Sequence, residues 1–560
     1  MLTAAVVVGV VFFRSGGVPA ACAGTAAPAV QVRFLLVGDA GDPAVEGWES
    51  AFALEGVPYE RVPAADVDRL RLVAADGAGE FAATVVANSG TLTPKEDARL
   101  STYEQRFGLR RIIAIATTSA GPVQVPVDET PLSGRIARLT AAGRALFPYL
   151  RGQVPIDGAT GRPQTLGAGA TSLVSLGGAS LLTEWRRADG VDELLMGVRT
   201  SPHLVHELLL APGMIAWALN GVVPGSWRPY FDVDVDDILL PSFTWIEATK
   251  SSGYASGVLN PTTLGEFTVR MTPADLAAAA TWERQEHFTL DMGLNGYGLG
   301  YDCDSLARAV TSDASDFRWF NHTYQHLNFD NLPEQQMVDQ IVDNVRWAKD
   351  HGVDLNPREL VTGQQSGLHN PQLPAALRDA GVRVIASDAS RDPVPKRHGD
   401  AVALPRHPMN VYQDAATRIE EVEEYDARYH VHITWPEFVQ GESTRLLRLV
   451  LENDPRPSYA HESNLAKDRI LLDVLTTTLD RYRNLVRVPF AQPTMTGALD
   501  ALVQQRAWWG AVRRGAVSIV RRGSTLTYTS KTAVDAPLTV DSRTQWIALR
   551  PGHPTVVQLP

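Results

Sequence analysis

The chain has 560 residues, of which 44% are hydrophobic and 20% are charged. This composition can bury enough apolar surface to offset the entropy lost on ordering, so it excludes wholesale disorder, and the length corresponds to about three to five domains. The net charge of −12 and the lack of long basic runs argue against nucleic acid and anionic membrane surfaces as partners.

The first residues have the pattern of a secretory signal. Residues 2–13 form an apolar stretch, and Ala21, Cys22 and Ala23 follow as a small-x-small cleavage pattern. The stretch is shorter than the about 18 residues that span a bilayer, and a first buried β-strand is the alternative interpretation. We therefore expect residues 1–23 to be a signal peptide, the protein to be secreted to the extracellular space or the cell surface, and the mature chain to have no membrane span.

Residues 24–225 begin with alternating strands and helices. Residues 30–37 predict a buried strand that leads into a turn and a helix, and residues 82–116 repeat the strand, helix, strand order. Such alternation is typical of a parallel sheet covered by helices, here an accessory α/β domain. Between about 118 and 201, short apolar runs broken by Gly, Pro, Ser and Thr indicate a β-rich insertion or sandwich.

From residue 226 to 500 the alternation of strands and helices resumes. Residues 228–240 predict a strand, and the apolar spacing after Pro333 predicts a helix. Repetition over this length favours a distorted (β/α) barrel. Residues 501–560 alternate apolar and polar residues, which indicates a small C-terminal antiparallel β module. The predicted fold is therefore a multidomain α/β protein.

The densest acidic stretch lies at the end of the first predicted barrel strand. Asp232, Asp234 and Asp236 share one face of that strand, while Asp237 points the other way until the chain leaves the strand. Carboxylates at this spacing repel one another unless a cation or shared protons neutralise them. The strand ends of a barrel carry its chemistry, and the apolar neighbours argue against a solvated turn. The sequence therefore predicts a functional acidic site.

Two histidines supply matching ligands. His322 and His326 are spaced at i and i+4, which places both imidazoles on one face if the segment is a helix. Such a pair alone also occurs on plain surface helices. Together with one carboxylate, however, it makes a metal site with open positions for water, as hydrolytic zinc sites require.

These residues, together with a late lone histidine, resemble the polysaccharide deacetylase (NodB-type) pattern. The resemblance implies that Asp236 is the catalytic base and His461 the catalytic acid. It implies that Asp237, His322 and His326 bind a divalent metal, for which Zn²⁺ is the expected ion.

A fuller match is to a distant branch, the carbohydrate esterases typified by secreted fungal galactosaminogalactan deacetylases. The stretches similar to that branch are 234–238, 362–368, 404–410 and 461–465. The resemblance implies a secreted amidohydrolase that removes the N-acetyl group from hexosamine units, such as N-acetylgalactosamine, of an exopolysaccharide. It also makes the accessory region a candidate for carbohydrate binding. The residues expected to bind substrate or tune the site are Arg406, Asp388, Tyr459, Tyr324 and Asn410.

Two alternatives stay open. A glycoside hydrolase with a chitinase-like barrel has a similar acidic ladder, but its acid is a Glu two residues beyond the last Asp, where Ile238 stands here. A non-catalytic carbohydrate-binding protein needs aromatic platforms and no metal site. The hexosamine polymer, the metal and the oligomeric state are left open by the sequence.

Overall fold

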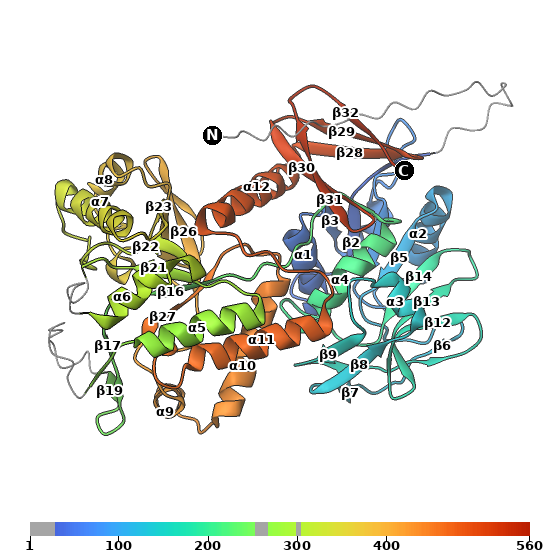
Figure 1. Ribbon diagram of the computed structural model, residues 1–560. Helices are drawn as coiled ribbons and strands as arrows, with labels where there is room; N and C mark the ends of the chain where they lie inside the picture. The colour runs from blue at the N-terminus through green and yellow to red at the C-terminus, as the bar shows by residue number, and fades with distance from the viewer. Residues whose placement is uncertain (1–27, 253–266, 298–303) are drawn as a thin grey trace.

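The computed structural model describes residues 28–252, 267–297 and 304–560 (Figure 1). The predicted signal peptide at 1–23 and both cysteines, Cys22 and Cys303, lie outside the described residues. Within the described ranges, no helix is long and apolar enough to cross a membrane.

The N-terminal part is built on a nine-stranded mixed sheet in the order β3-β2-β4-β5-β14-β13-β12-β8-β9. The parallel strands are β3 (Tyr59–Val62), β2 (Phe34–Val37), β4 (Ala83–Val86), β5 (Arg110–Ile113) and β14 (Asp192–Met196). The antiparallel continuation is β13 (Ala179–Arg186), β12 (Ala170–Leu176), β8 (Arg135–Leu139) and β9 (Gln153–Ile156). Because β14 pairs with β5, the strands predicted as an insertion or sandwich extend the accessory sheet itself.

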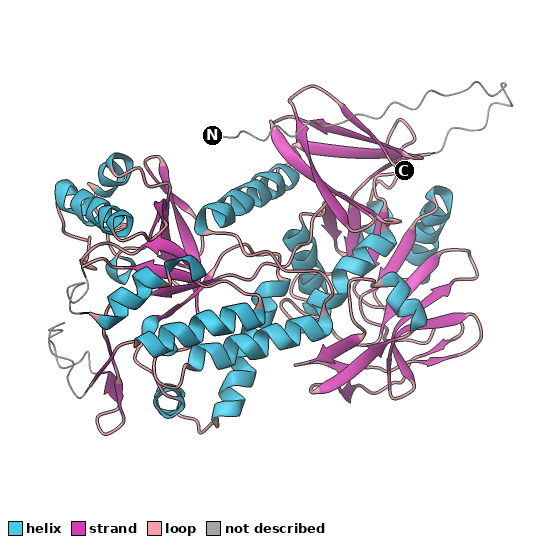
Figure 2. Ribbon diagram, viewed as in Figure 1, coloured by secondary structure: helices cyan, strands magenta, loops and turns pink. Residues whose placement is uncertain are grey.

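Three helices pack against strands of this sheet: α1 (Pro43–Glu55), α3 (Ala141–Leu146) and α4 (Val205–Ala218). The side chain of Asp42 caps the start of α1, and Gly56 ends that helix with φ of 73°. Almost every residue of α4 is buried, since this helix packs against α1 on one side and α10 (Trp435–Leu451) on the other. Figure 2 shows the long helices in the middle, between strands of the N-terminal sheet on the right and the barrel on the left.

Seven parallel strands close into a barrel, which confirms the prediction of a distorted (β/α) barrel. In order around the barrel they are β16 (Val233–Asp236), β21 (Asp291–Leu294), β22 (Arg318–Asn321), β23 (Leu355–Leu360), β24 (Val384–Asp388), β26 (Ala401–Pro408) and β27 (Ser458–His461). A short strand, β25 (Lys396–His398), adds antiparallel to β26. The strand predicted at 228–240 is wrong in length, because only Val233–Asp236 pairs with its neighbours.

Helices surround the barrel and bury its outer face. They include α5 (Pro273–Glu286), α7 (Glu334–Asp350), α8 (Leu373–Asp379), α11 (Ile470–Leu485) and α12 (Met495–Arg513). Pro333 stands just before α7, as predicted. Met337 and Ile341 of α7 pack with Leu373 and Leu377 of α8, which covers β23 and β24.

The C-terminal strands are antiparallel, as their alternation predicts, but they do not stand alone. The tail comprises β28 (Val517–Arg522), β29 (Thr525–Ser530), β30 (Val534–Val540), β31 (Arg543–Leu549) and β32 (Thr555–Gln558). One sheet takes in β1 (Ala29–Gln31), which pairs with β28, and the other takes in β15 (Val222–Val223), which pairs with β30. The tail is therefore tied to the N-terminal half of the chain.

Candidate active site

The acidic residues lie where β16 ends and the chain turns into the mouth of the barrel. Asp236 is the last residue of β16, and Asp237 follows with φ of 69°. This left-handed conformation turns the chain out of the strand, so the two successive carboxylates serve the same end of the barrel. β27 lies beside β16 in a register that pairs Asp236 with His461. Gly293 packs closely here, since a Cβ there would lie 3.0 Å from the ring of Phe320 and 3.2 Å from the Cα of Asp236.

His322 and His326 lie on the loop after β22, so the prediction that they share a helical face is wrong. Thr323 has φ of 63° and His326 has φ of 57°, which a continuous right-handed helix does not allow. The loop nevertheless brings the two imidazoles together, with ring centroids 4.9 Å apart. The predicted pair is therefore formed by backbone turns instead of helical spacing.

Asp237, His322 and His326 meet at one point. Oδ1 of Asp237 lies 2.9 Å from Nε2 of His322 and 3.2 Å from Nε2 of His326. Nδ1 of His322 lies 2.8 Å from the carbonyl oxygen of Val361, which can only accept a hydrogen bond, so Nδ1 carries the proton. In neutral His322 the lone pair of Nε2 then faces the carboxylate, whose Oδ1 is buried without a hydrogen-bond partner among the described residues. Converging lone pairs of two nitrogens and one oxygen fit a divalent metal such as Zn²⁺.

Asp236 is held by Arg406, whose side chain is completely buried. Nη1 of Arg406 donates to Oδ1 of Asp236 at 2.9 Å, and Nη2 donates to Oδ2 at 2.8 Å. Burial raises the pKa of Asp236, but the guanidinium outweighs burial and leaves the pKa below its ordinary value. Asp236 is therefore an oriented carboxylate that stays ionised.

A second acidic group lies deeper in the barrel, below Asp236. Nη1 of Arg406 also donates to Asp234 at 3.0 Å, and Arg318 forms ion pairs with Asp232 and Asp291. Burial raises the pKa of Asp232 to about 6 and raises the pKa values of Asp234 and Asp291 well above the usual range. The sequence predicts that a cation or shared protons neutralise the acidic face. In the structure, arginine side chains and bound protons neutralise Asp232, Asp234 and Asp291.

The residues predicted to bind substrate lie at different depths. The ring of Tyr459 stands 4.4 Å from the guanidinium carbon of Arg406, and Asp388 pairs in register with Arg406 on the neighbouring strand. Asn410 is exposed, and its side chain donates to Glu442 at 2.9 Å. Tyr324 lies on the histidine loop and forms an edge-to-face pair with Tyr297, with centroids 5.7 Å apart. The substrate contact of Arg406 stays a prediction, since its described partners are carboxylates and this ring.

Sequence reasoning missed the buried amides that hold the histidine loop. The side chain of Asn295 donates to the carbonyl oxygens of His322 and Thr323, and that of Asn344 donates to the carbonyl of Leu294 and to Asn321. Gln340 lies four residues before Asn344 on α7. Gln340 and Asn344 could have been recognised in the sequence, because they are polar residues at i and i+4 on the apolar face of the predicted helix. Buried amides need hydrogen-bond partners, so such a pair indicates a nearby loop that it holds.

Comparison with known proteins finds a matching domain and a structure that shares the fold. Residues 300–483 match the model of the Agd3 deacetylase domain. The solved structure of Agd3, described as a novel carbohydrate deacetylase, superposes with a TM-score of 0.79 at 16% identity, over 95% of this chain and 99% of that chain. No sequence in the search of curated proteins matches.

Two other solved structures are much less similar. A family 4 carbohydrate esterase from Streptomyces lividans has a TM-score of 0.24 at 10% identity, over 47% of this chain and 100% of that chain. The chitin deacetylase from Colletotrichum lindemuthianum has a TM-score of 0.27 at 11% identity, over 47% and 85% of the two chains. The domain match confirms the deacetylase resemblance predicted from the motifs, and the Agd3 structure shares the fold.

Proposed function

Because residues 300–483 match the Agd3 deacetylase domain and the chain shares the fold of Agd3, we propose that this chain is a carbohydrate deacetylase. We propose further that it is a secreted, metal-dependent enzyme that removes N-acetyl groups from hexosamine units of an exopolysaccharide. We propose a polymer that contains N-acetylgalactosamine as the substrate and Zn²⁺ as the metal. The observation that carries the proposal is the convergence of Asp237, His322 and His326 beside the Arg406-bound carboxylate of Asp236.

In this proposal the metal ligands are Asp237, His322 and His326. A divalent metal held there would lower the pKa of a bound water towards about 7 and polarise the acetamide carbonyl. The hydrogen bond from His322 to Val361 fixes the tautomer that presents Nε2 to the site.

Asp236 acts as the base in this proposal. Its carboxylate accepts a proton from the attacking water while Arg406 holds both of its oxygens and keeps it ionised. His461, one strand away in register with Asp236, donates a proton to the amide nitrogen. The C–N bond then breaks, and acetate and a free sugar amine leave. The amine needs this proton because an unprotonated amide nitrogen is a poor leaving group.

We propose that the remaining predicted residues orient the sugar at the barrel mouth. Tyr459 and Tyr324 present ring faces on which a sugar can stack, and Asn410 offers an exposed amide. Asp388 is assigned to tuning Tyr459, whose pKa is raised by burial and, in part, by this carboxylate. Arg406 is assigned primarily to orienting Asp236, with a direct substrate contact as the further expectation.

The test is to incubate the purified full chain with N-acetylated galactosamine polymer and to quantify acetate and new reducing ends in the same samples. We expect acetate without new reducing ends. New reducing ends without acetate would replace the proposal by the glycoside hydrolase, and binding without either product would replace it by a non-catalytic carbohydrate-binding protein. Chitin oligomers run in parallel separate N-acetylgalactosamine from N-acetylglucosamine substrates.

A further inference from the structure

A cavity of about 420 Å³ lies outside the barrel, where the N-terminal helices meet the β30–β31 hairpin. We call it the junction cavity. Its chemistry is set by Glu55, Tyr149, Trp217, Trp227 and Asp541. It has two carboxyl groups and no Lys, Arg or His among the described residues that line it. Its volume falls within the range of about 300 to 1,000 Å³ that is typical of small-molecule sites.

The polar atoms of the three aromatic side chains form hydrogen bonds within the protein. The hydroxyl of Tyr149 donates to the carbonyl of Leu209 and accepts from the amide of Gly213. Nε1 of Trp227 donates to the carbonyl of Leu451, and Nε1 of Trp217 donates to Glu184. What these residues can offer to a ligand is therefore ring surface, which favours apolar faces and cations.

Glu55 is the unusual group of this cavity. Its side chain is buried, and it has no hydrogen-bond or ion-pair partner among the described residues. Burial alone raises the pKa of Glu55 to about 8. A carboxyl left without a donor in an aromatic cavity costs stability unless it stays protonated or meets a cation.

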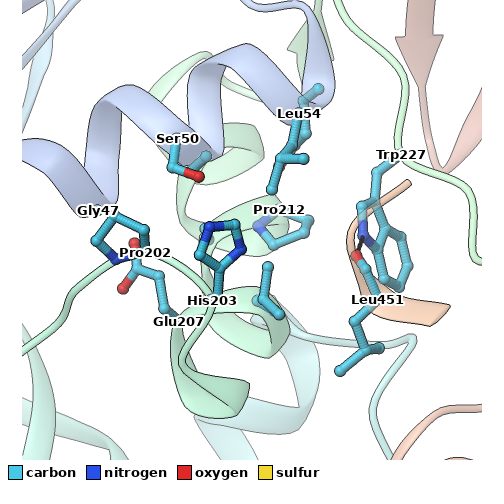
Figure 3. A pocket seen from close by; sticks show the side chains of 13 residues that line it. Gly47, Ser50, Leu54, Pro202, His203, Glu207, Pro212, Trp227 and Leu451 are labelled. Carbon is cyan, nitrogen blue, oxygen red and sulfur yellow. Dashed lines mark hydrogen bonds between the residues drawn. The ribbon is translucent and has the colours of Figure 1, made fainter. Parts of the chain in front are cut away.

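A smaller space of about 10 Å³ adjoins the junction cavity, since Glu55, Pro212 and Trp227 line both. Figure 3 shows Pro212 and Trp227 there between Leu54 and Leu451. The small space has room for about one water. Glu207 lines only this space, and burial raises its pKa to about 8 as well. Glu207 is therefore a buried acid with the same raised pKa as Glu55. It does not line the larger cavity, so a ligand there does not reach it.

We propose that the junction cavity binds an aminosugar, the de-N-acetylated hexosamine unit, with its ammonium paired to Glu55 and its apolar face against Tyr149 and Trp227. The choice of ligand rests on the proposed function, which produces this amine. Asp541 at the mouth adds a second negative charge on the entry path. The N-acetylated unit carries no charge and would leave Glu55 without a partner, so the cavity selects product over substrate.

Binding of the ammonium to Glu55 should release a proton, which can be measured. Glu55 binds its proton in the free protein at neutral pH, and pairing with an ammonium releases that proton to solvent. The titratable groups that line the same spaces as Glu55 are Tyr149 and Asp541 in the cavity, and Glu207 and His203 around the small space. His203 is already paired with Glu452 of α10 at 2.6 Å. Affinity therefore rises with pH only while the sugar amine keeps its proton, and it falls once that amine is neutral.

The experiment is calorimetric titration of the full chain with galactosamine oligomers, in two buffers of different ionisation enthalpy. Binding should release protons, and Glu55→Gln should weaken it about 10- to 100-fold, because a hydrogen-bonded charge pair is lost. Glu207→Gln is the matched control and should bind like wild type. Asp541→Asn, a surface change that does not threaten the fold, should weaken binding a few-fold.

Equal affinity in Glu55→Gln and wild type would overturn the proposal, and so would equal affinity for the N-acetylated oligomer. Competition by free lysine at the same concentration would also overturn it, by identifying a general ammonium pocket. Acetate release, measured in parallel on a short N-acetylated substrate, should be unchanged in Glu55→Gln. A wild type that binds the amine but releases no acetate would contradict the proposed function alone.

Discussion

The neighbouring carboxylates of Asp236 and Asp237 have different partners at the centre of the site. Asp236 ends a strand and faces Arg406, whereas Asp237 has φ of 69° and faces His322 and His326. In the proposed mechanism, one backbone residue in the left-handed region therefore separates the group assigned to proton transfer from the group assigned to metal binding. Substitution of each carboxylate should separate these two tasks.

We expect Asp236→Asn to retain the metal and to lose at least about a hundredfold in kcat, because it removes the base but no ligand. Asp237→Asn should lose metal and activity together, because it removes one of three ligands. Metal content per chain and acetate release, measured on the same preparations, check both. Full activity in Asp236→Asn would remove it as the base.

The chemistry at residue scale was predictable where it depends on residue type and spacing. That Asp237, His322 and His326 lie together could be predicted, because few other residue types are metal ligands and the structure brings their ligand atoms to one point. The role of Arg406 beneath Asp236 was not predictable, because the two residues are far apart in sequence and come together only when β27 pairs with both β16 and β26. The helix expected for His322 and His326 was wrong because i, i+4 spacing carries no information about positive φ.

At the scale of elements, the loop between β22 and α7 is shaped by buried amides. Asn344 donates to the carbonyl of Leu294 and to Asn321, and its own oxygen accepts from the amide of Gly296. Since the same loop carries His322 and His326, these bonds set the positions of two proposed ligands.

Asn344→Ala should weaken metal affinity about 10- to 100-fold, as expected for loss of a group that orients metal ligands. The measurement is metal competition with a chelating dye, together with the Co²⁺ absorption spectrum, which reports ligand geometry. Gln335→Ala is the control, because Gln335 is exposed on the same helix and its only bond within the described part of the chain is to Asp339. Loss of stability with an unchanged metal affinity would assign Asn344 a purely structural role.

Element lengths and partners were harder to predict than element types. The helix after Pro333 could be recognised from its apolar period, but the strand expected at 228–240 contributes only Val233–Asp236 to the barrel. Buried strands are apolar on both faces and show no alternation. The apolar residues of the adjoining loops therefore cannot be told apart from the strand by pattern.

At the scale of the whole molecule, α12 and the tail connect the two halves of the chain. Trp508 of α12 is fully buried, and its Nε1 donates to the carbonyl of Gly56 at the end of α1 at 2.7 Å. β1 pairs with β28, close to the opposite end of the chain. Such pairings follow from the assembled fold and leave no local sequence signal, so the tail could be predicted as antiparallel but not as shared.

Trp508→Ala should lower the free energy of unfolding by about 3 to 5 kcal/mol, because it opens a large cavity between α12 and α1. Urea denaturation followed by circular dichroism measures this. Val503→Ala on the same helix is the control, and it should stay within about 0.5 kcal/mol of wild type because Val503 is exposed. A loss as small as that of the control would mean that the contact of α12 with α1 does not hold the two halves together.

Stability should also depend on pH through Glu207. Its native pKa is raised to about 8 by burial, whereas the unfolded chain releases this proton near about pH 4.3. Between these values the native state binds more protons, so the free energy of unfolding falls as pH rises, by up to about 1.4 kcal/mol per unit. Glu207→Gln should therefore gain stability over wild type at pH 8 and gain less at pH 5. Parallel pH profiles in thermal melts would contradict this.

We propose that the barrel site is a metal-dependent deacetylase centre. Acetate release by the full chain, measured before and after metal removal, tests this assignment. Acetate from N-acetylated galactosamine polymer should stop when a chelator removes the metal and should return when Zn²⁺ is added back. Undiminished acetate release from metal-free protein, or none from the metal-loaded protein, would contradict the account.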